Sequence, residues 1–440
     1  MASTYLTKAA DNAANQNIFT LSAWLKPSSN SFNGAFVSFA ESSVRYVRMF
    51  FESGKLCIKQ AYDGSTEADT KTTALYKDSS SWYHVVIAVD STQAVSSNRI
   101  KMYVNGEQIT SFSSEDYGAI NTDFVTRTTC YVGQSGNSDN YFDGSMSQVI
   151  YVDGTQYAAS TFGSTDSTSG QWKPNADPSV TYGSTGFKLT FEDTSALGDD
   201  TSGNTNDLTM SGSGTPTLDC PSNNFSTMNP IDNYYANMTF SQGANTTVSD
   251  HPAPSVSTLG MTSGKYYFEA KAVSSTSGND WQIGIISTQV TATSNEIGNF
   301  ANDYSYRGSN GYYRTNDSET SYGNTYTSGD VIGCAVDLTN NKLYFSKNGT
   351  WQASGDPTSG STGTGAISIT APASTSLGVY LVAVGADASA NSYTWSMNFG
   401  NGYFGTTAVT SAGTSASTPG TFEYDVPTGY QPLTTKGLNV

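Results

Sequence analysis

The sequence predicts an all-β protein made of two antiparallel β-sandwich domains of the jelly-roll type in tandem. Helical periodicity is almost absent, and short alternating apolar and polar runs recur between turn signals. The 28 Tyr, 20 Phe and 42 Gly residues supply half-buried strands and turns. A chain of 440 residues is too long for one hydrophobic core, which leads us to expect more than one domain.

Charge and composition narrow the class of protein. Aromatic residues make up 12% of the chain, so it is expected to fold although charged residues are only 13%. The formal net charge of −17 disfavours nucleic acids and anionic membrane surfaces. No stretch approaches the ~18 apolar residues of a membrane span, and the first residues lack the pattern of a signal peptide. We therefore expect no nucleic-acid partner and no membrane insertion.

The cysteines bear on where the protein is made. They are Cys57, Cys130, Cys220 and Cys334. They form no CxxC pair, and each lies in or beside an apolar run, which predicts small buried thiols without a disulfide framework. Synthesis in a cytosol fits this pattern, whereas the acidic surface rich in Ser, Thr, Asn and Gly is typical of exposed proteins. A phage particle reconciles the two, because its parts are made inside a bacterium and released by lysis.

A hairpin is predicted in each half of the chain. Residues 83–90 alternate and place Tyr83, Val85, Ile87 and Val89 on one face. The next run, 100–104, ends at Asn105-Gly106, a dipeptide that favours a type I′ turn with an antiparallel return. In the second half, residues 331–338 and 342–346 are the two predicted strands, joined by a turn at 339–341. The second strand ends at the turn signal Asn348-Gly349.

The boundary between the halves is predicted in a turn-rich connection. Residues 221–230 contain Pro at both ends and several Ser and Asn between them. We place the first domain at residues 1–225 and the second at 226–440.

Motifs of the first half suggest a family. They are residues 18–26, 82–86, 100–106 and 141–149. This series resembles the laminin-G/concanavalin A-like jelly roll, in which the first segment is the opening core strand and the last closes the sandwich. A further series resembles one that recurs in bacteriophage, notably marine cyanophage, fibre and virion proteins. Its segments are 162–163, 170–174, 182–187, 197–204 and 220–230.

The second half carries motifs of a different family. They are residues 264–269, 283–285, 329–337 and 343–349. This series resembles the SPRY (B30.2-type) sandwich, and its last two segments match the most recognisable hairpin of that family. SPRY modules are binding domains, so the resemblance implies recognition through loops rather than catalysis.

Hydrolysis has to be weighed because concanavalin A-like folds include glucanases. A retaining glucanase needs two carboxylates about 5 Å apart in one cleft. No Glu-x-Asp-x-x-Glu run occurs, and the neighbours Glu192 and Asp193 point to opposite faces of a strand. The histidines, His84 and His251, have no nucleophile or ligand partner in the sequence. We expect no enzyme and no cofactor, with a glycoside hydrolase as the minor alternative.

Calcium is the one candidate metal. Carboxylate and amide residues gather in one segment, and a hard cation prefers several oxygen ligands. The candidate ligands are Asp199, Asp200, Asn204, Asn206 and Asp207. Their spacing does not match an EF-hand, and Asp and Asn are also common in turns, so solvated turns are the alternative.

Aromatic and arginine residues concentrate between positions 304 and 326. The candidate ligand-binding residues are Tyr304, Tyr306, Arg307, Tyr312, Tyr313, Arg314, Tyr322 and Tyr326. Rigid rings and guanidinium groups are favoured at binding hot spots. The alternative is a pair of core strands around a turn, in which some of these tyrosines are structural.

Together these patterns predict a non-enzymatic phage virion structural protein displayed on the particle. The expected role is a fibre, spike or decoration subunit that binds a host-surface glycan or protein. The alternative is a purely architectural capsid cement or adaptor. Expected partners are other virion proteins and the host surface, within a homo-oligomer that could be a trimer. The predicted location is the virion, after synthesis in the host cytoplasm and release by lysis.

Overall fold

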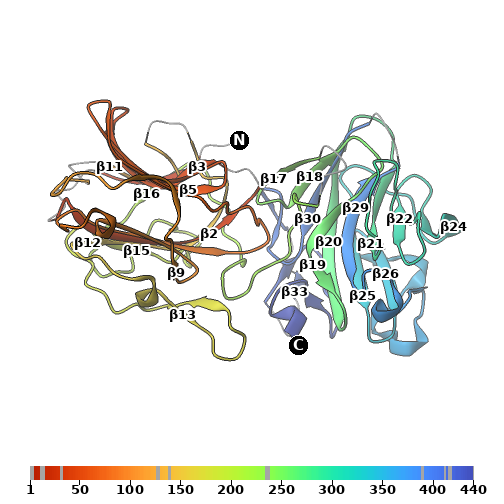
Figure 1. Ribbon diagram of the computed structural model, residues 1–440. Coiled ribbons are helices and arrows are strands. Elements are labelled where there is room, and N and C mark those ends of the chain that lie inside the picture. Colours follow the sequence, from red (N-terminus) through yellow and green to blue (C-terminus); the bar gives the residue numbers. More distant parts are fainter. Residues whose placement is uncertain are drawn as a thin grey trace. The chain divides into compact units, whose positions relative to one another are not determined.

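Large antiparallel sheets in each half of the chain confirm the predicted all-β fold class. The computed structural model describes residues 4–9, 15–29, 33–124, 129–136, 140–232, 238–387, 391–410, 413–414 and 419–439. The chain divides into two units, Met1–Pro216 and Thr217–Val440, each with its own core (Figure 1). Among the described residues, no helix is long and apolar enough to cross a membrane.

The first unit stacks two sheets. The eight-stranded sheet has the order β10-β6-β5-β4-β3-β11-β1-β16. Its strands are β1 (Tyr5–Lys8), β3 (Gly34–Ser42), β4 (Arg45–Glu52), β5 (Lys55–Tyr62), β6 (Ser65–Thr72), β10 (Phe112–Asp116), β11 (Thr129–Val132) and β16 (Thr209–Ser211). The six-stranded sheet has the order β15-β12-β2-β7-β8-β9. Its strands are β2 (Ile18–Pro27), β7 (Tyr83–Asp90), β8 (Ile100–Val104), β9 (Glu107–Gln108), β12 (Gly144–Asp153) and β15 (Phe187–Leu189).

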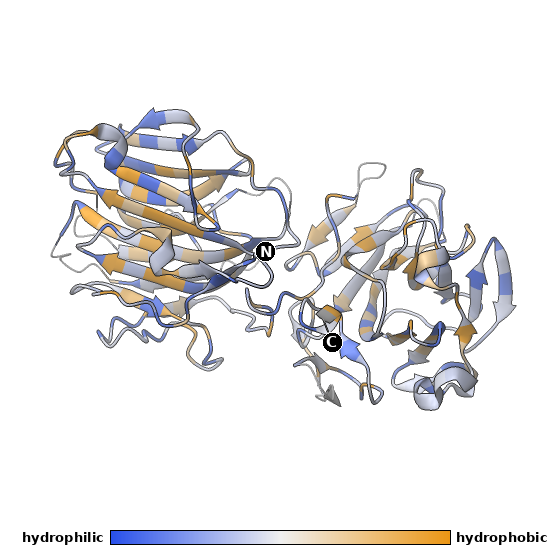
Figure 2. Cartoon of the chain, turned by 60° about the horizontal axis from the view of Figure 1, so that its bottom comes forward, coloured by the Kyte–Doolittle hydropathy of each residue, from blue (hydrophilic) through white to orange (hydrophobic). Residues whose placement is uncertain are grey.

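The main core of the first unit lies between these sheets. Val85, Ile87 and Val89 of β7 are at most 1% exposed, as their alternation predicted. Figure 2 shows the corresponding alternation of hydrophobic and hydrophilic residues along the strands. The turn after β8 is also confirmed, because Asn105 and Gly106 have φ angles of 50° and 86°, the positive values that a type I′ turn requires.

A second, smaller core lies on the outer face of the six-stranded sheet. It is covered by a hairpin of β13 (Gly163–Thr165) and β14 (Trp172–Pro174). The Trp172 ring stacks on His84 with centroids 5.9 Å apart. A Cβ added at Gly106 would lie 2.6 Å from the Trp172 ring, so this position must be glycine for the hairpin to dock.

The second unit also stacks two sheets. The larger sheet has the path β17-β18-β30-β20-β25-β26-β27, with β28 beside β26 and β35 parallel to β20. Its strands are β17 (Thr239–Ser241), β18 (Thr246–Ser249), β20 (Lys265–Ser275), β25 (Val331–Asp337), β26 (Lys342–Lys347), β27 (Thr350–Trp351), β28 (Ile367–Ser368), β30 (Tyr393–Asn398) and β35 (Gln431–Pro432). The smaller sheet has the order β19-β29-β21-β22-β23-β24. Its strands are β19 (Ser255–Met261), β21 (Trp281–Ile286), β22 (Tyr304–Arg307), β23 (Tyr312–Thr315), β24 (Ser318–Ser321) and β29 (Tyr380–Ala386).

The remaining elements are short. Two small hairpins pair β31 (Tyr403–Phe404) with β32 (Thr407–Ala408) and β33 (Gly413–Thr414) with β34 (Thr421–Phe422). The helical elements among the described residues are 3-10 turns, η1 (Ser96–Asn98), η2 (Ala159–Thr161), η3 (Gln352–Ser354), η4 (Pro357–Thr362), η5 (Pro372–Ser374) and η6 (Gly437–Asn439).

The first residues of the second unit differ from the predicted domain boundary. Residues 217–225 were assigned to the first domain, yet Phe225 forms a β-bridge with Thr434. The backbone N–H of Ser226 donates to the carbonyl of Leu433 at 3.0 Å. These contacts span about 200 positions of the sequence, which is why turn composition alone could not assign them.

The buried carboxylate of Glu269, in β20, anchors the segment that contains β34. It accepts hydrogen bonds from the backbone N–H groups of Glu423 at 2.8 Å and Tyr424 at 2.9 Å. The Tyr267 hydroxyl and the Asn398 amide also donate to it. Burial nevertheless raises the pKa of Glu269 to about 7.

Candidate functional site

The aromatic and arginine segment of the second unit forms β22, β23 and the turn between them. Tyr304, Tyr306 and Tyr326 point into the core and are at most 6% exposed. The Tyr326 hydroxyl donates to the carbonyl of Tyr306 at 2.7 Å. A surface role for these three side chains is therefore wrong. The pairing of β22 with β21 places Tyr304 and Tyr306 between the two sheets, and Tyr326 enters the same core from the segment between β24 and β25.

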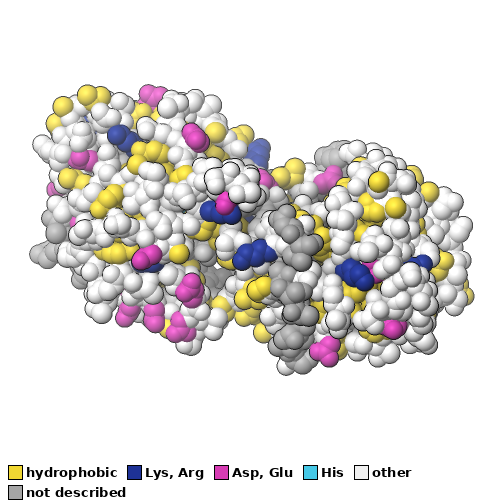
Figure 3. Space-filling model, turned by 90° about the horizontal axis from the view of Figure 1, so that it is seen from below, with side chains coloured by type: hydrophobic (Ala, Val, Ile, Leu, Met, Phe, Trp, Pro, Cys, Tyr) yellow, Lys and Arg dark blue, Asp and Glu magenta, His cyan; other side chains and the backbone are white. Residues whose placement is uncertain are grey.

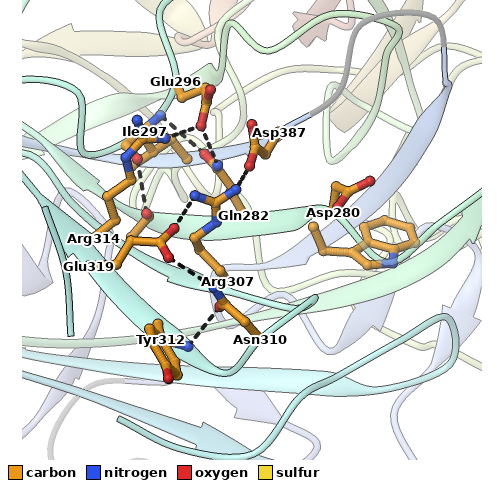
Figure 4. Close-up of polar contacts among 12 residues, drawn as sticks. Asp280, Gln282, Glu296, Ile297, Arg307, Asn310, Tyr312, Arg314, Glu319 and Asp387 are labelled. Carbon is orange, nitrogen blue, oxygen red and sulfur yellow. Dashed lines mark hydrogen bonds and ion pairs between the residues drawn. The ribbon is translucent and has the colours of Figure 1, made fainter. Parts of the chain in front are cut away.

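Arg307 ends β22 on the opposite, outward face. Its guanidinium forms ion pairs with Glu319 of β24 and with Asp387, which follows β29 (Figure 4). The residue is only 7% exposed, so direct capture of a ligand by this guanidinium is not available. Its role is to join three strands of the smaller sheet.

Arg314 of β23 forms the second half of the same network. It pairs with Glu296, in the loop after β21, and with Asp317, in the turn after β23. Gln282 connects this loop to the sheet, because its amide donates to Glu296 at 3.0 Å and accepts from the N–H of Ile297 at 3.2 Å. Each arginine is thus held by two carboxylates from different segments of the chain, which fixes this end of the sheet (Figure 4).

Among the predicted aromatics, Tyr312 is the most exposed. It is 38% exposed, and its N–H donates to the side chain of Asn310 at 3.0 Å. Tyr313 and Tyr322 are partly buried against the core, and the Tyr322 hydroxyl accepts from the N–H of Phe345 at 3.2 Å. The exposed surface of this site is therefore Tyr312 framed by the ion-paired residues.

Carboxylates outnumber cations in this frame. The two guanidinium groups face Glu296, Asp317, Glu319 and Asp387. The hydrogen bond from Arg314 lowers the pKa of Asp317, so this exposed carboxylate is charged at neutral pH. Charged side chains are sparse elsewhere: on the face shown in Figure 3, they form small separate groups on a mostly uncharged surface. An acidic frame around an exposed tyrosine suits a polar, positively charged partner.

The sequence reasoning missed the four carboxylates of this network. One signal was available in the sequence, because the dipeptide Asn316-Asp317 favours a tight turn. In the structure these residues have positive φ angles of 47° and 60°, and the turn sets Glu319 opposite Arg314. No local signal identifies Glu296 or Asp387, because each comes from a loop distant in sequence.

The candidate calcium ligands of the first unit bind one another and the backbone. Asp200 accepts from the N–H groups of Lys188, Ser202 and Asn206 at 2.8–2.9 Å, and also from the Ser202 hydroxyl. The side chain of Asp207 accepts from the Asp200 N–H at 2.9 Å. The amide groups of Asn204 and Asn206 donate to carbonyls of residues 183–186. Asp199 is exposed, and its N–H donates to the carbonyl of Ala196.

These contacts make the cluster a hydrogen-bonded turn that fastens the loops beside β15. Within the part of the chain that the structure describes, no group of three or more His, Cys, Asp or Glu side chains is arranged to hold a metal ion. Four of the five candidate side chains are thus already engaged in hydrogen bonds within the protein, and calcium binding here stays a prediction.

The remaining chemical candidates are also occupied. His84 is fully buried, and burial lowers its pKa to about 3. Asp193 accepts a hydrogen bond from the Ser195 hydroxyl at 2.6 Å, and both Asp193 and Glu192 are exposed. Cys57, Cys130 and Cys334 are buried as predicted, whereas Cys220 is partly exposed.

Comparison with known proteins identifies both units. Residues 2–150 match the model of the concanavalin A-like lectin/glucanases superfamily, and residues 265–365 match the SPRY domain. The chain therefore carries a concanavalin A-like domain followed by a SPRY domain. A crystal structure of the SPRY domain of human HERC1 covers 35% of this chain at 16% identity, with 87% of that chain covered and a TM-score of 0.26.

The curated relatives match a short segment. Ran-binding protein 9 of Xenopus tropicalis is 38% identical over 103 residues, which cover 23% of this chain and 17% of the relative. Ran-binding protein 9 of Homo sapiens is 39% identical over 101 residues, which cover 22% of this chain and 13% of the relative. The chain thus spans less than a fifth of the length of these proteins.

These relatives contradict the phage interpretation. They are Ran-binding proteins of animals, and nothing in the comparisons indicates a bacteriophage origin. The predicted roles as fibre, spike, decoration, cement or adaptor, the virion and host-surface partners and the virion location are therefore wrong. The motifs that suggested a phage protein have structural roles instead: Trp172 docks a hairpin, Asp200 fastens a turn, and Phe225 pairs with the last strand region of the second unit.

Proposed function

We propose that this chain is a non-catalytic protein-interaction protein whose SPRY domain binds a segment of a partner protein. The observation that carries the proposal is the SPRY match over residues 265–365, which contains β22, β23 and β24 with the Arg307–Arg314 network. Binding is proposed at the surface of Tyr312 and the carboxylates around it.

Rigidity and composition support this position. The two arginines connect β22, β23 and β24 to loops that precede and follow them in sequence, so the surface is ordered before a partner arrives. A rigid, partly exposed tyrosine provides contact area at low entropic cost. The excess of carboxylates favours a partner segment that carries Lys or Arg.

The names of the relatives state that they bind Ran. The matched segment covers 13% of the human relative, so the proposal for this chain is limited to protein binding and does not name that partner.

The test is selection from a peptide library displayed on yeast, with the purified full chain as bait. We expect the enriched peptides to share a Lys or Arg. Tyr312→Ala should weaken binding of an enriched peptide by roughly tenfold or more, the effect of losing a hot-spot side chain. Asp317→Asn should weaken it as well, because Asn tolerates the positive φ at this position but removes the charge.

Leu377→Ala is the matched control. Leu377 is 40% exposed and lies in the second unit, before the opposite end of β29. This variant should bind like the wild type. If no peptide is enriched, or if all three variants bind alike, the SPRY surface proposed here is not the binding site.

A further inference from the structure

The outer face of the eight-stranded sheet in the first unit holds two cations side by side. Arg48 of β4 is paired in register with Lys59 of β5, so both side chains leave the same face of the sheet directly opposite each other. Like charges in this position destabilise a sheet. Within the described part of the chain, neither residue forms an ion pair.

Neighbouring cations on these strands are neutralised. Arg45 pairs with Glu41 and Asp63, and Lys71 pairs with Glu52. Asp69 follows Lys59 in the same row of the sheet. It forms no ion pair with Lys59 within the described residues, and one of its oxygens is buried without a hydrogen-bond partner there. Asp116 of β10 lies opposite Asp69, so the row carries its two cations on β4 and β5 and its two carboxylates on β6 and β10.

Aromatic rings border the two cations. The Arg48 guanidinium lies 3.7 Å from the centroid of the Tyr46 ring. A stacked guanidinium keeps N–H donors at its edge, in the geometry that a carboxylate accepts. Phe50, two residues along β4 on the same face, and Tyr131, in the same row on β11, are partly exposed.

We propose that this face, defined as Tyr46, Arg48, Phe50, Lys59 and Tyr131, binds an acidic segment of a partner protein. The two cations form the positive end of this row, and the complement of that end is a carboxylate-bearing peptide. The aromatic border supplies contact area of the kind that is enriched in protein interfaces. The site lies in the first unit, so it is independent of the binding proposed for the SPRY domain.

The probe is a fluorescein-labelled peptide of repeated Glu-Tyr-Ser units, and a Lys-Tyr-Ser peptide is its charge-reversed counterpart. Fluorescence anisotropy with the full chain should show binding of the Glu peptide only, weakening as salt increases. The double variant Arg48→Ser with Lys59→Ser should lose roughly tenfold or more in affinity. Its melting temperature should stay the same or rise, because the repulsion between the two cations is removed.

Lys101→Ser with Lys173→Ser is the matched control, since it removes the same charge from β8 and β14 of the first unit. This control should bind the Glu peptide like the wild type. Equal loss in both double variants would overturn the proposal, because binding would then follow net charge alone. Absence of wild-type binding would overturn it too, as would binding of heparin or anionic lipid vesicles without binding of the peptide.

Discussion

The indole Nε1–H of Trp172 donates a hydrogen bond to Nδ1 of His84 at 2.9 Å. Nδ1 must therefore be unprotonated, and Nε2 carries the proton that faces the hydroxyl of Ser22, also at 2.9 Å. Trp24, the cross-strand neighbour of His84, stacks on the imidazole with ring centroids 4.8 Å apart. Protonation of Nδ1 would set two N–H donors against each other inside a dry aromatic stack.

The first unit should lose stability in acid because of this histidine. Burial lowers the His84 pKa from 6.5 to about 3, so between these pH values the unfolded state binds a proton that the folded state does not. The free energy of unfolding should fall with decreasing pH by up to about 1.4 kcal/mol per unit across this window. Unfolding in urea, followed by ¹⁹F NMR of 5-fluorotryptophan at Trp24 and Trp82, measures it. His84→Gln should flatten the profile; an unchanged profile would show that other groups dominate.

The second unit should respond in the opposite direction. Burial raises the pKa of Glu269 from 4.5 and that of Asp303 from 3.8, each to about 7. The folded state then holds protons that the unfolded state releases, so stability is greatest below about pH 4 and is lost as pH rises towards 7. The ¹⁹F signals of Trp281 and Trp395 report this transition in the same samples.

Glu269→Gln isolates one of these two groups. The substitution keeps the size of the side chain but replaces one carboxylate oxygen with an NH₂ group. That NH₂ group would face a backbone N–H of Glu423 or Tyr424, so one hydrogen bond is lost. We expect a weaker dependence on pH and faster amide exchange at Glu423 and Tyr424. Exchange that stays as slow as in the wild type would show that Glu269 does not hold this segment.

Trp172→Ala should release the outer hairpin of the first unit without unfolding the sandwich. The ring fills the space between Gly106, Gly163 and His84, and loss of a packed aromatic side chain costs about 3 kcal/mol or more. Protease cleavage between β13 and β14 should accelerate, while the far-ultraviolet circular dichroism of the strands is retained. Lys173→Ala, which removes an exposed ion pair of the same hairpin, should have little effect.

Arg307→Ala should destabilise the second unit. The substitution leaves Glu319 and Asp387 without their shared cation. We expect a loss of about 2 kcal/mol, below the usual cost for a buried pair, because both carboxylates are about one-third exposed. Tyr312→Ala in the same strands should change the melting temperature little. A melting temperature unaffected by Arg307→Ala would mean that the network is not structural.

Removal of divalent ions should leave the melting temperature of the first unit unchanged. The oxygens of Asp200 already accept hydrogen bonds from the protein, so EDTA and added calcium are both expected to have no effect. Asp200→Ala should destabilise the unit by about 1–3 kcal/mol, because buried N–H groups lose their acceptor. A rise in melting temperature on addition of calcium would contradict this assignment.

Local patterns predicted local structure in this chain, and long-range pairing decided the rest. The alternation of Val85, Ile87 and Val89 and the Asn105-Gly106 turn depend on neighbours in sequence, and both were predicted. The burial of Tyr306 depends on β21 and on the facing sheet, which no spacing within residues 304–314 reveals. Asp387 reaches Arg307 from 80 positions away, so the candidate site could be located in the sequence but not assembled from it.

The pairing of Phe225 with Thr434 has a consequence for how the second unit can be rearranged. Its first and last described strand regions are adjacent, with Asn224 and Thr435 joined by two hydrogen bonds of 2.9 and 3.0 Å. A short linker could therefore join the two ends, and new termini could be opened in an exposed loop such as residues 276–279, between β20 and β21. A circular permutant of this kind would keep every strand pairing of both sheets and the Tyr312 surface. Only the order of the strands along the chain would change.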